Sequence, residues 1–256
     1  MASHLAVFDE LLDEYFTNYY SEHPADATYM GIDSGEGRLN IATLAALRRQ
    51  NKRRRTALAK LDTIAPSTLS NEQNLDRLAF RARLLRECED FNRGRHTLDP
   101  SGLDELFGCL LREMQRGETE SKRAAQNIRC LLRGASRYLT QSARLIDRPE
   151  RVWRSIMDNS FKASDSFFDA VASFLKTNGN KKEDPSIILL AKQGCRRYHA
   201  NVMSKRLAKP NSFAIGAEQL QRRIRDELGL DYTVGQVEAI ALSEIERISS
   251  VLKKAL

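Results

Sequence analysis

One periodicity runs along almost the whole chain. Apolar side chains recur every three or four residues, which is the spacing of one face of an α-helix. The first segment shows this clearly, with Phe8, Leu12, Tyr15 and Tyr19 on one face. No stretch alternates apolar and polar residues between turn signals, as the strands of a half-buried sheet do. The sequence therefore predicts an all-α protein of long antiparallel helices in a single irregular bundle, without a substantial β-sheet.

The breaks between the predicted helices are short and carry residues with known preferences for helix ends. Pro24 suits the first position of a short helix, and Gly31 suits the left-handed position after it. Ser70 and Gln73 have the spacing of a capping box at the start of a longer helix. Gly117 is expected to end another helix. Because these breaks are short, we expect residues 1–256 to form a single helical domain.

The composition is that of an ordinary globular protein, with 41% hydrophobic and 29% charged residues. No apolar run approaches the ~18 residues that span a bilayer, so no membrane partner is expected. The first residues, MASHLAVFDELLDEYF, lack the basic and apolar regions of a secretory signal. A cytoplasmic location is therefore expected. The four cysteines are widely spaced without a CxxC motif, which favours reduced thiols over a disulfide framework.

Charge is distributed unevenly along the chain. Residues 1–40 hold eight acidic side chains and one basic one and carry −7, so the remainder must carry +14 to give the net charge of +7. The densest basic run lies in the predicted second long helix and comprises Arg48, Arg49, Lys52, Arg53, Arg54 and Arg55. An acidic first helix beside a basic second one favours an antiparallel pair whose charges match. The alternative is a basic surface for a partner, although no aromatic residue interleaves the run to stack on nucleic-acid bases.

The residues that commonly carry chemistry are scattered. The motif HExxH, which presents two zinc-binding histidines and a base on one helical face, is absent from these 256 residues. The one local pair at ligand spacing is Cys195 with His199, for which a core cysteine beside a surface histidine is favoured over a metal site. No serine or cysteine lies in an activating motif. The sequence therefore predicts no catalytic, cofactor-binding or metal-binding residue.

Three short motifs occur in an order that is typical of a known family. They are HPxxATxxG after the first helix, an Asp-Pro turn before a leucine-rich helix, and FxxGxE near the end. Their residues, for which structural roles are expected, are Pro24, Ala27, Thr28, Gly31, Asp99, Pro100, Phe213, Gly216 and Glu218. In this order they resemble the N-terminal half of the bacterial domain-of-unknown-function 885 family. The resemblance implies a relationship to helical zinc metallopeptidases, whose HExxH motif lies in a C-terminal half.

The resemblance implies a non-catalytic scaffold half that forms part of a peptide-binding cleft. Such a chain would be inactive alone, would need a missing or separate HExxH half, and would leave zinc to that half. Its expected partner is a separate C-terminal subunit or a second copy of itself, and nucleic acid is not expected. The last predicted helix is still periodic at Leu256, which suggests that further chain once followed. The alternative is a stand-alone basic helical interaction protein that binds a protein partner or nucleic acid.

Overall fold

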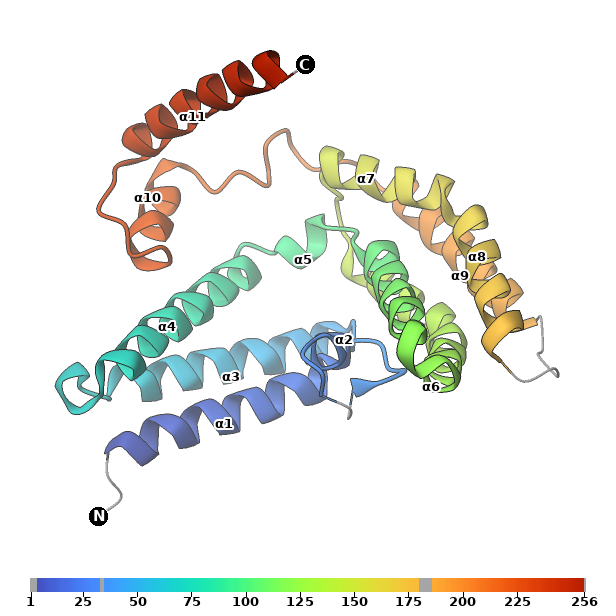
Figure 1. Cartoon of the computed structure of the whole chain (residues 1–256), viewed down its shortest axis with the longest axis horizontal. Coiled ribbons are helices and arrows are strands. Elements are labelled where there is room, and N and C mark those ends of the chain that lie inside the picture. The colour runs from blue at the N-terminus through green and yellow to red at the C-terminus, as the bar shows by residue number, and fades with distance from the viewer. Residues whose placement is uncertain (1–3, 33–34, 180–185, 256) are drawn as a thin grey trace.

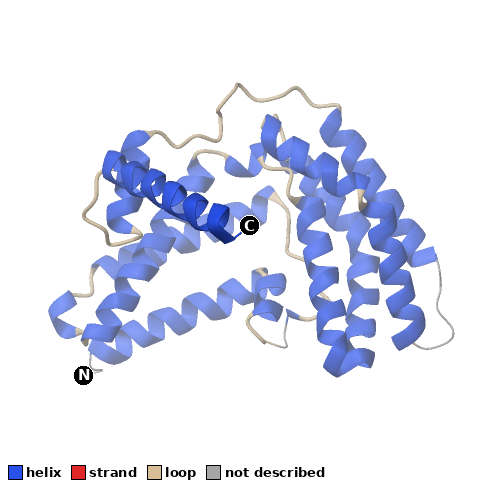
Figure 2. Cartoon of the chain, turned by 45° about the horizontal axis from the view of Figure 1, so that its top comes forward, coloured by secondary structure: helices blue, strands red, loops and turns tan. Residues whose placement is uncertain are grey.

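The computed structural model describes residues 4–32, 35–179 and 186–255, and these ranges contain helices but no strand (Figures 1 and 2). The prediction of an all-α fold is confirmed. The helices are α1 (His4–Glu22), α2 (Pro24–Tyr29), α3 (Leu44–Asp62), η2 (Pro66–Thr68), α4 (Asn71–Asn92), α5 (Arg95–Leu98), α6 (Gly102–Leu145), α7 (Arg151–Lys162), α8 (Ser164–Asn178), α9 (Ser186–Met203), α10 (Ala217–Asp226) and α11 (Val234–Ala255).

The helices α1, α3 and α4 form an N-terminal group in which successive long helices run antiparallel (Figure 1). Phe8, Leu61 and Leu84 are fully buried where the three helices meet. Ion pairs fix the direction of α1 against α3. Glu22, at the end of α1, contacts Arg53 at 2.9 Å, whereas Glu14, earlier in α1, contacts Lys60 at 2.8 Å. The predicted pairing of an acidic with a basic helix is confirmed.

The second group consists of α6 to α9, and α6 is a helical hairpin. Glu120 interrupts it with φ −129° and ψ 52°. The two arms then meet side by side, because the Tyr138 hydroxyl donates to Glu105 and the Asn127 amide donates to Glu113. The prediction that Gly117 ends a helix is wrong by three residues. Gly117 lies inside the first arm, where a Cβ atom would overlap the ring of Phe174.

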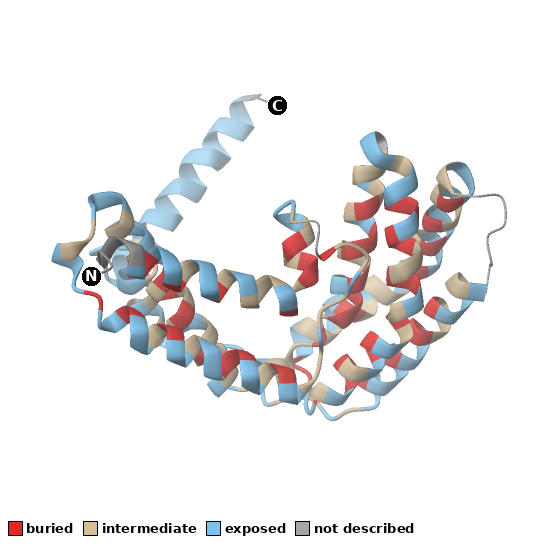
Figure 3. Cartoon of the chain, turned by 90° about the horizontal axis from the view of Figure 1, so that it is seen from below, coloured by how far each residue is buried: buried red, intermediate tan, exposed pale blue. Residues whose placement is uncertain are grey.

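The buried apolar side chains gather in two clusters, one in each group (Figure 3). The larger cluster fills the space between the α6 hairpin, α8 and α9, with Leu106, Leu139 and Phe168 at its centre. The two groups are set at a steep angle and are joined through α2, the following loop and α5. The space where they meet is lined by several polar residues. A single domain over residues 1–256 stays a prediction.

The helix ends that were predicted from Pro24, Gly31, Ser70 and Gln73 are found in the structure. The helix α2 begins at Pro24, and Gly31 has φ +77°. The side chain of Ser70 accepts from the backbone of Gln73, and the side chain of Gln73 accepts from Ser70, which completes the capping box. These contacts involve neighbours in sequence, and this explains why they could be predicted.

The helices α10 and α11 follow a long connection and lie on the N-terminal side of the molecule. Ion pairs attach α10 to α4, with Arg223 3.1 Å from Asp90 and Arg86 3.3 Å from Glu227. The helix α11 packs against α10 and then projects with nearly all of its surface exposed (Figure 3). Its apolar face remains open and comprises Ile240, Ile245, Ile248, Val251 and Leu252. No helix among the described residues is long and apolar enough to cross a membrane.

Candidate functional site

A pocket of about 350 Å³, which we call the central pocket, opens between the two helical groups. Its walls come from His23 between α1 and α2, the loop before α3, α3, α4, the α5 turn, both arms of α6, and α9. This volume lies within the range of small-molecule and peptide side-chain sites. Elements far apart in the sequence therefore combine to form one concave surface that carries both polar and apolar groups.

The floor of the central pocket carries a carboxylate with unusual surroundings. Glu105 accepts a hydrogen bond of 2.5 Å from the hydroxyl of Tyr138, which is itself buried. Glu105 is exposed to solvent through the pocket, although protein atoms pack densely around its carboxylate. Burial raises the pKa of Glu105, the negative charges of Asp26 and Asp99 add to the rise, and hydrogen bonds with Tyr138 and Asn40 oppose it. The charged form of Glu105 thus lacks full compensation.

Asp99 lies on the wall beside Glu105. It belongs to the Asp-Pro turn that precedes α6, and its nearest cation is Arg95, at a long 3.5 Å. Burial raises the pKa of Asp99, although the charge of Arg95 works against the rise. The two acids therefore place a region of negative potential in the pocket.

Two neutral acceptors face the same space. Nδ1 of His23 lies 2.9 Å from the carbonyl oxygen of Tyr19, and burial lowers the pKa of His23. Because a carbonyl only accepts, Nδ1 of the neutral ring carries the proton and Nε2 keeps a free lone pair. Gln50 is 5% exposed, and its Oε1 has no hydrogen-bond partner among the described residues. A buried amide oxygen without a partner is costly and indicates an unfilled contact.

The arginines that line the central pocket are already held by acids. Nε of Arg54 lies 2.6 Å from Glu87, and both side chains are largely buried. Arg95 is 3.3 Å from Asp90. Their charges are therefore matched within the wall, which leaves the acceptors around Glu105 as the uncompensated part of the site.

The predicted motif residues have different positions. Asp99 lines the central pocket and Pro100 is buried directly behind it. Ala27 is fully buried, and Thr28 closes α2 by donating to the carbonyl of Pro24 at 3.0 Å. Phe213 lies near Trp153, Gly216 precedes α10 with φ +81°, and Glu218 is exposed in the first turn of α10. Two of the three motifs contribute to the pocket: the Asp-Pro turn through Asp99, and HPxxATxxG through its first residue, His23.

The six residues of the basic run do not share one environment. Arg49 and Arg53 contact Glu22, at 3.8 and 2.9 Å, and Arg54 contacts Glu87. The remaining three are exposed and form no ion pair with the described part of the chain: Arg48, Lys52 and Arg55. Three of the six predicted basic residues thus form ion pairs with acids of the same chain.

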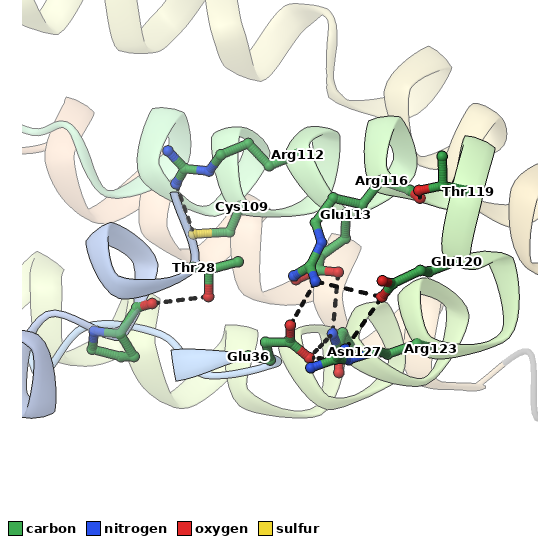
Figure 4. A network of polar contacts seen from close by, with 11 residues as sticks. Thr28, Glu36, Cys109, Arg112, Glu113, Arg116, Thr119, Glu120, Arg123 and Asn127 are labelled. Carbon is green, nitrogen blue, oxygen red and sulfur yellow. Dashed lines mark hydrogen bonds and ion pairs between the residues drawn. The ribbon is translucent and has the colours of Figure 1, made fainter. Parts of the chain in front are cut away.

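A second polar cluster lies at the closed end of the α6 hairpin (Figure 4). Glu36, in the loop after α2, is 2.7 Å from both Arg116 and Arg123 and accepts from the Asn127 amide at 3.1 Å. Burial alone would raise the pKa of Glu36, but hydrogen bonds from Asn127, Arg116 and Arg123 outweigh it and hold the pKa below its ordinary value. We interpret this cluster as a clamp that ties the loop to the two arms of α6.

The described residues do not fit a zinc site. No three His, Cys, Asp or Glu side chains within them are arranged to hold a metal ion. Cys195 is buried, whereas His199 stacks on Phe161 and lies 2.8 Å from Asp158. The expectation that zinc belongs to another half stays a prediction.

The sequence analysis did not assign a role to Glu105, Gln50 or His23. Tyr138 carries the one available signal, because a buried tyrosine hydroxyl needs a hydrogen-bond partner. The identity of that partner, 33 residues away, depends on the hairpin fold.

Fold and site together define an all-α protein with a pocket of polar and apolar side chains between two helical groups, and the 256 residues contain no HExxH motif. The chain belongs to the bacterial family of proteins of unknown function DUF885, whose sequence model matches residues 24–256. The match begins at Pro24, the proline of the HPxxATxxG motif. No curated protein matches the chain, and neither does any solved structure.

Proposed function

We propose that the chain is a non-catalytic helical half of a zinc-metallopeptidase-like protein and forms one wall of a peptide-binding cleft. The central pocket is the observation that carries this proposal. It lies between two helical groups, and the Asp-Pro turn of the family motif, with Asp99 at its edge, forms part of its wall. Hydrolysis would depend on a separate HExxH half, since these 256 residues lack that motif.

A neighbouring groove supports an extended ligand. It lies between α1 and α3, has a volume of about 190 Å³, and shares His23, Gln50 and Arg54 with the central pocket. A peptide could thus continue from one concavity into the next without leaving the surface. Both concavities combine polar groups with apolar side chains such as Leu47 and Leu11, which suits a chain of alternating polar backbone and variable side chains.

The open apolar face of α11 is the surface through which we expect the HExxH half to dock. It presents Ile240, Ile245, Ile248, Val251 and Leu252 to solvent, which is unusual for a helix of a stable monomer. Adding a separately produced HExxH half should restore peptide hydrolysis. The double variant Ile245→Glu with Ile248→Glu should abolish that restoration, whereas Ser250→Glu, on the other side of α11, should not.

Peptide binding tests the proposal directly. Fluorescence anisotropy with a dye-labelled hexapeptide should show saturable binding and, in the same samples, no hydrolysis with or without added zinc. Ser101 lines the central pocket and makes no side-chain capping hydrogen bond, so Ser101→Trp should fill the pocket and weaken binding by at least about tenfold. Ser155→Trp, on the exposed side of α7, is the matched control. Equal binding by both variants, or hydrolysis by the purified chain with stoichiometric metal, would contradict the proposal.

The alternative, a basic interaction protein, depends on Arg48, Lys52 and Arg55. These three residues are exposed on α3, but they are few for a phosphate-binding surface. A salt titration of binding to generic DNA and RNA separates the two functions. Strong binding that falls steeply with salt, and that is lost in the triple alanine variant, would favour the alternative.

A further inference from the structure

Several hydrogen-bond acceptors that line the central pocket have unused capacity. The carboxylate of Glu105 forms no ion pair among the described residues, and that of Asp99 is paired with Arg95 at 3.5 Å. Oε1 of Gln50 has no partner within the described chain, and Nε2 of neutral His23 keeps its lone pair. Three different kinds of acceptor therefore line one space.

The charged side chains that line the pocket support the same conclusion. Four carboxylates line the pocket, from Glu87, Asp90, Asp99 and Glu105, with two guanidinium groups, from Arg54 and Arg95. Glu87 and Asp90 are also paired from outside the pocket, by Arg83 at 2.9 Å and by Arg223 at 3.1 Å, so the unmatched negative charge lies at Glu105. Arg54 is held by Glu87 and Arg95 by Asp90, so neither cation is available to Glu105 without breaking an ion pair. An occupant that supplies both positive charge and N–H donors would satisfy the wall.

We propose that the central pocket binds a protonated amine or guanidinium group of a peptide, with Glu105 and Asp99 as the anionic contacts and Gln50 and His23 as neutral acceptors. This inference rests on the proposed function in that the group is carried by a peptide. Two parts of a peptide offer this chemistry, the free α-ammonium group and a Lys or Arg side chain. Apolar side chains at the rim, Ile41, Leu47 and Leu145, would contact the aliphatic carbons next to the charge.

Metal ions offer a competing form of positive charge, but the geometry disfavours them. No set of three suitable side chains is arranged for a metal among the described residues. Directional acceptors of mixed type, an amide oxygen and an imidazole nitrogen, suit N–H donors.

Isothermal titration calorimetry with four probes tests the inference. The probes are Ala-Ala-Ala amide with a free amino terminus, its N-acetyl form, N-acetyl-Ala-Lys-Ala amide, and butylamine. We expect at least one cationic peptide to bind about tenfold or more tightly than the neutral N-acetyl peptide. A preference for the first probe assigns the site to the amino terminus, and a preference for the third assigns it to a basic side chain.

Two variants and one control connect that preference to the pocket. Glu105→Gln keeps the shape and the contact with Tyr138 but removes the charge, so it should abolish the preference for cationic probes. Gln50→Leu should weaken binding of the same probes by several-fold. Glu72→Gln, in the exposed first turn of α4, removes an acid of the same type elsewhere and should leave the preference unchanged. Circular dichroism of each variant confirms that it folds.

The outcomes separate this inference from the proposed function. If neutral and cationic peptides bind equally, the cation site is wrong while the peptide cleft stands. If butylamine binds in a Glu105-dependent manner but no peptide binds, the cation site stands while the peptide cleft is wrong. If no probe binds, both are wrong.

Discussion

The α6 hairpin has an acid at each end, and the two acids differ in how they are held. Glu36, at the closed end, lies between two guanidinium groups and an amide, and its pKa is lowered (Figure 4). Glu105, at the open end, is hydrogen-bonded by neutral groups and has negative neighbours, and its pKa is raised. Glu105 belongs to α6, and Glu36 contacts the same hairpin. The difference between their pKa shifts therefore comes from the charges and hydrogen-bond partners around each carboxylate.

This contrast separates a structural acid from one that is available to a ligand. The charge of Glu36 is matched by two guanidinium groups within the fold, so no further cation needs to bind there. Glu105 keeps unused capacity in a pocket that solvent can enter, which is where functional groups with shifted pKa values concentrate. Variants that disturb Glu36 should therefore affect stability, and variants that disturb Glu105 should affect binding.

The largest expected effect comes from the loop that carries Glu36. A Cβ atom on Gly35 would overlap the carbonyl oxygen of Pro24 and lie 2.8 Å from Cβ of Ala27. Because backbone cannot move aside easily, Gly35→Ala should lower the free energy of unfolding by about 3 kcal/mol. Urea denaturation measures this loss. The control is Gly108→Ala in α6, where a Cβ meets nothing within 4 Å and the change should be neutral or stabilising.

The second prediction concerns Glu36 itself. Glu36→Gln removes the charge that Arg116 and Arg123 share, so we expect a loss of about 2 kcal/mol in the free energy of unfolding. Binding of a cationic peptide at the central pocket should stay unchanged. Loss of binding without loss of stability would reverse the roles assigned to the two acids.

The parts of the fold that were predictable depend on near neighbours in sequence. Helical periodicity, the capping box of Ser70 with Gln73, and the left-handed Gly31 each involve residues a few positions apart. The pairing of α1 with α3 was predictable for a different reason, because each helix has a strong charge of opposite sign. The end of the first arm was wrongly predicted at Gly117, because a glycine can either end a helix or allow close packing. The ring of Phe174, which lies against Gly117, shows that close packing applies here.

The central pocket was not predictable in the same way. Glu105 and Tyr138 lie 33 residues apart, and Gln50 and His23 come from the other helical group. Nothing local distinguishes Glu105 from the many surface glutamates of the chain. Asp99 was assigned only to a motif with an expected structural role, and its position at the pocket follows from how the two groups meet. Sites assembled from several elements require the tertiary arrangement before their chemistry becomes visible.

The third prediction weakens the support of Glu105. Tyr138→Phe removes the hydroxyl that donates to Glu105 at 2.5 Å and leaves the ring in the core. We expect a loss of about 1 kcal/mol in the free energy of unfolding, which is half of the effect expected for Glu36→Gln. Because that hydrogen bond opposes the rise in the pKa of Glu105, the variant should raise this pKa further. Carbon-detected NMR titration of the Glu105 carboxyl measures it, and an unchanged or lower pKa would contradict the assigned role of Tyr138.

The smallest effect on stability, and the one with the opposite sign, is expected for Glu105→Gln. A carboxyl whose pKa is higher in the folded protein binds more protons there than in the unfolded chain, so stability falls as pH rises from the unfolded value of about 4.3 through the folded value. At pH 7 the ionised Glu105 therefore costs stability, and its replacement should raise Tm by about 1 °C, a small gain because solvent reaches the carboxylate. The gain should vanish near pH 4.

Glu36 behaves in the reverse manner, since a lowered pKa contributes stability that is present at pH 7 and is lost as pH falls through the folded value. Thermal melts of both variants at pH 4 and pH 7 measure the two signs, and Tm shifts of the same sign at pH 7 would show that the two acids are not held differently.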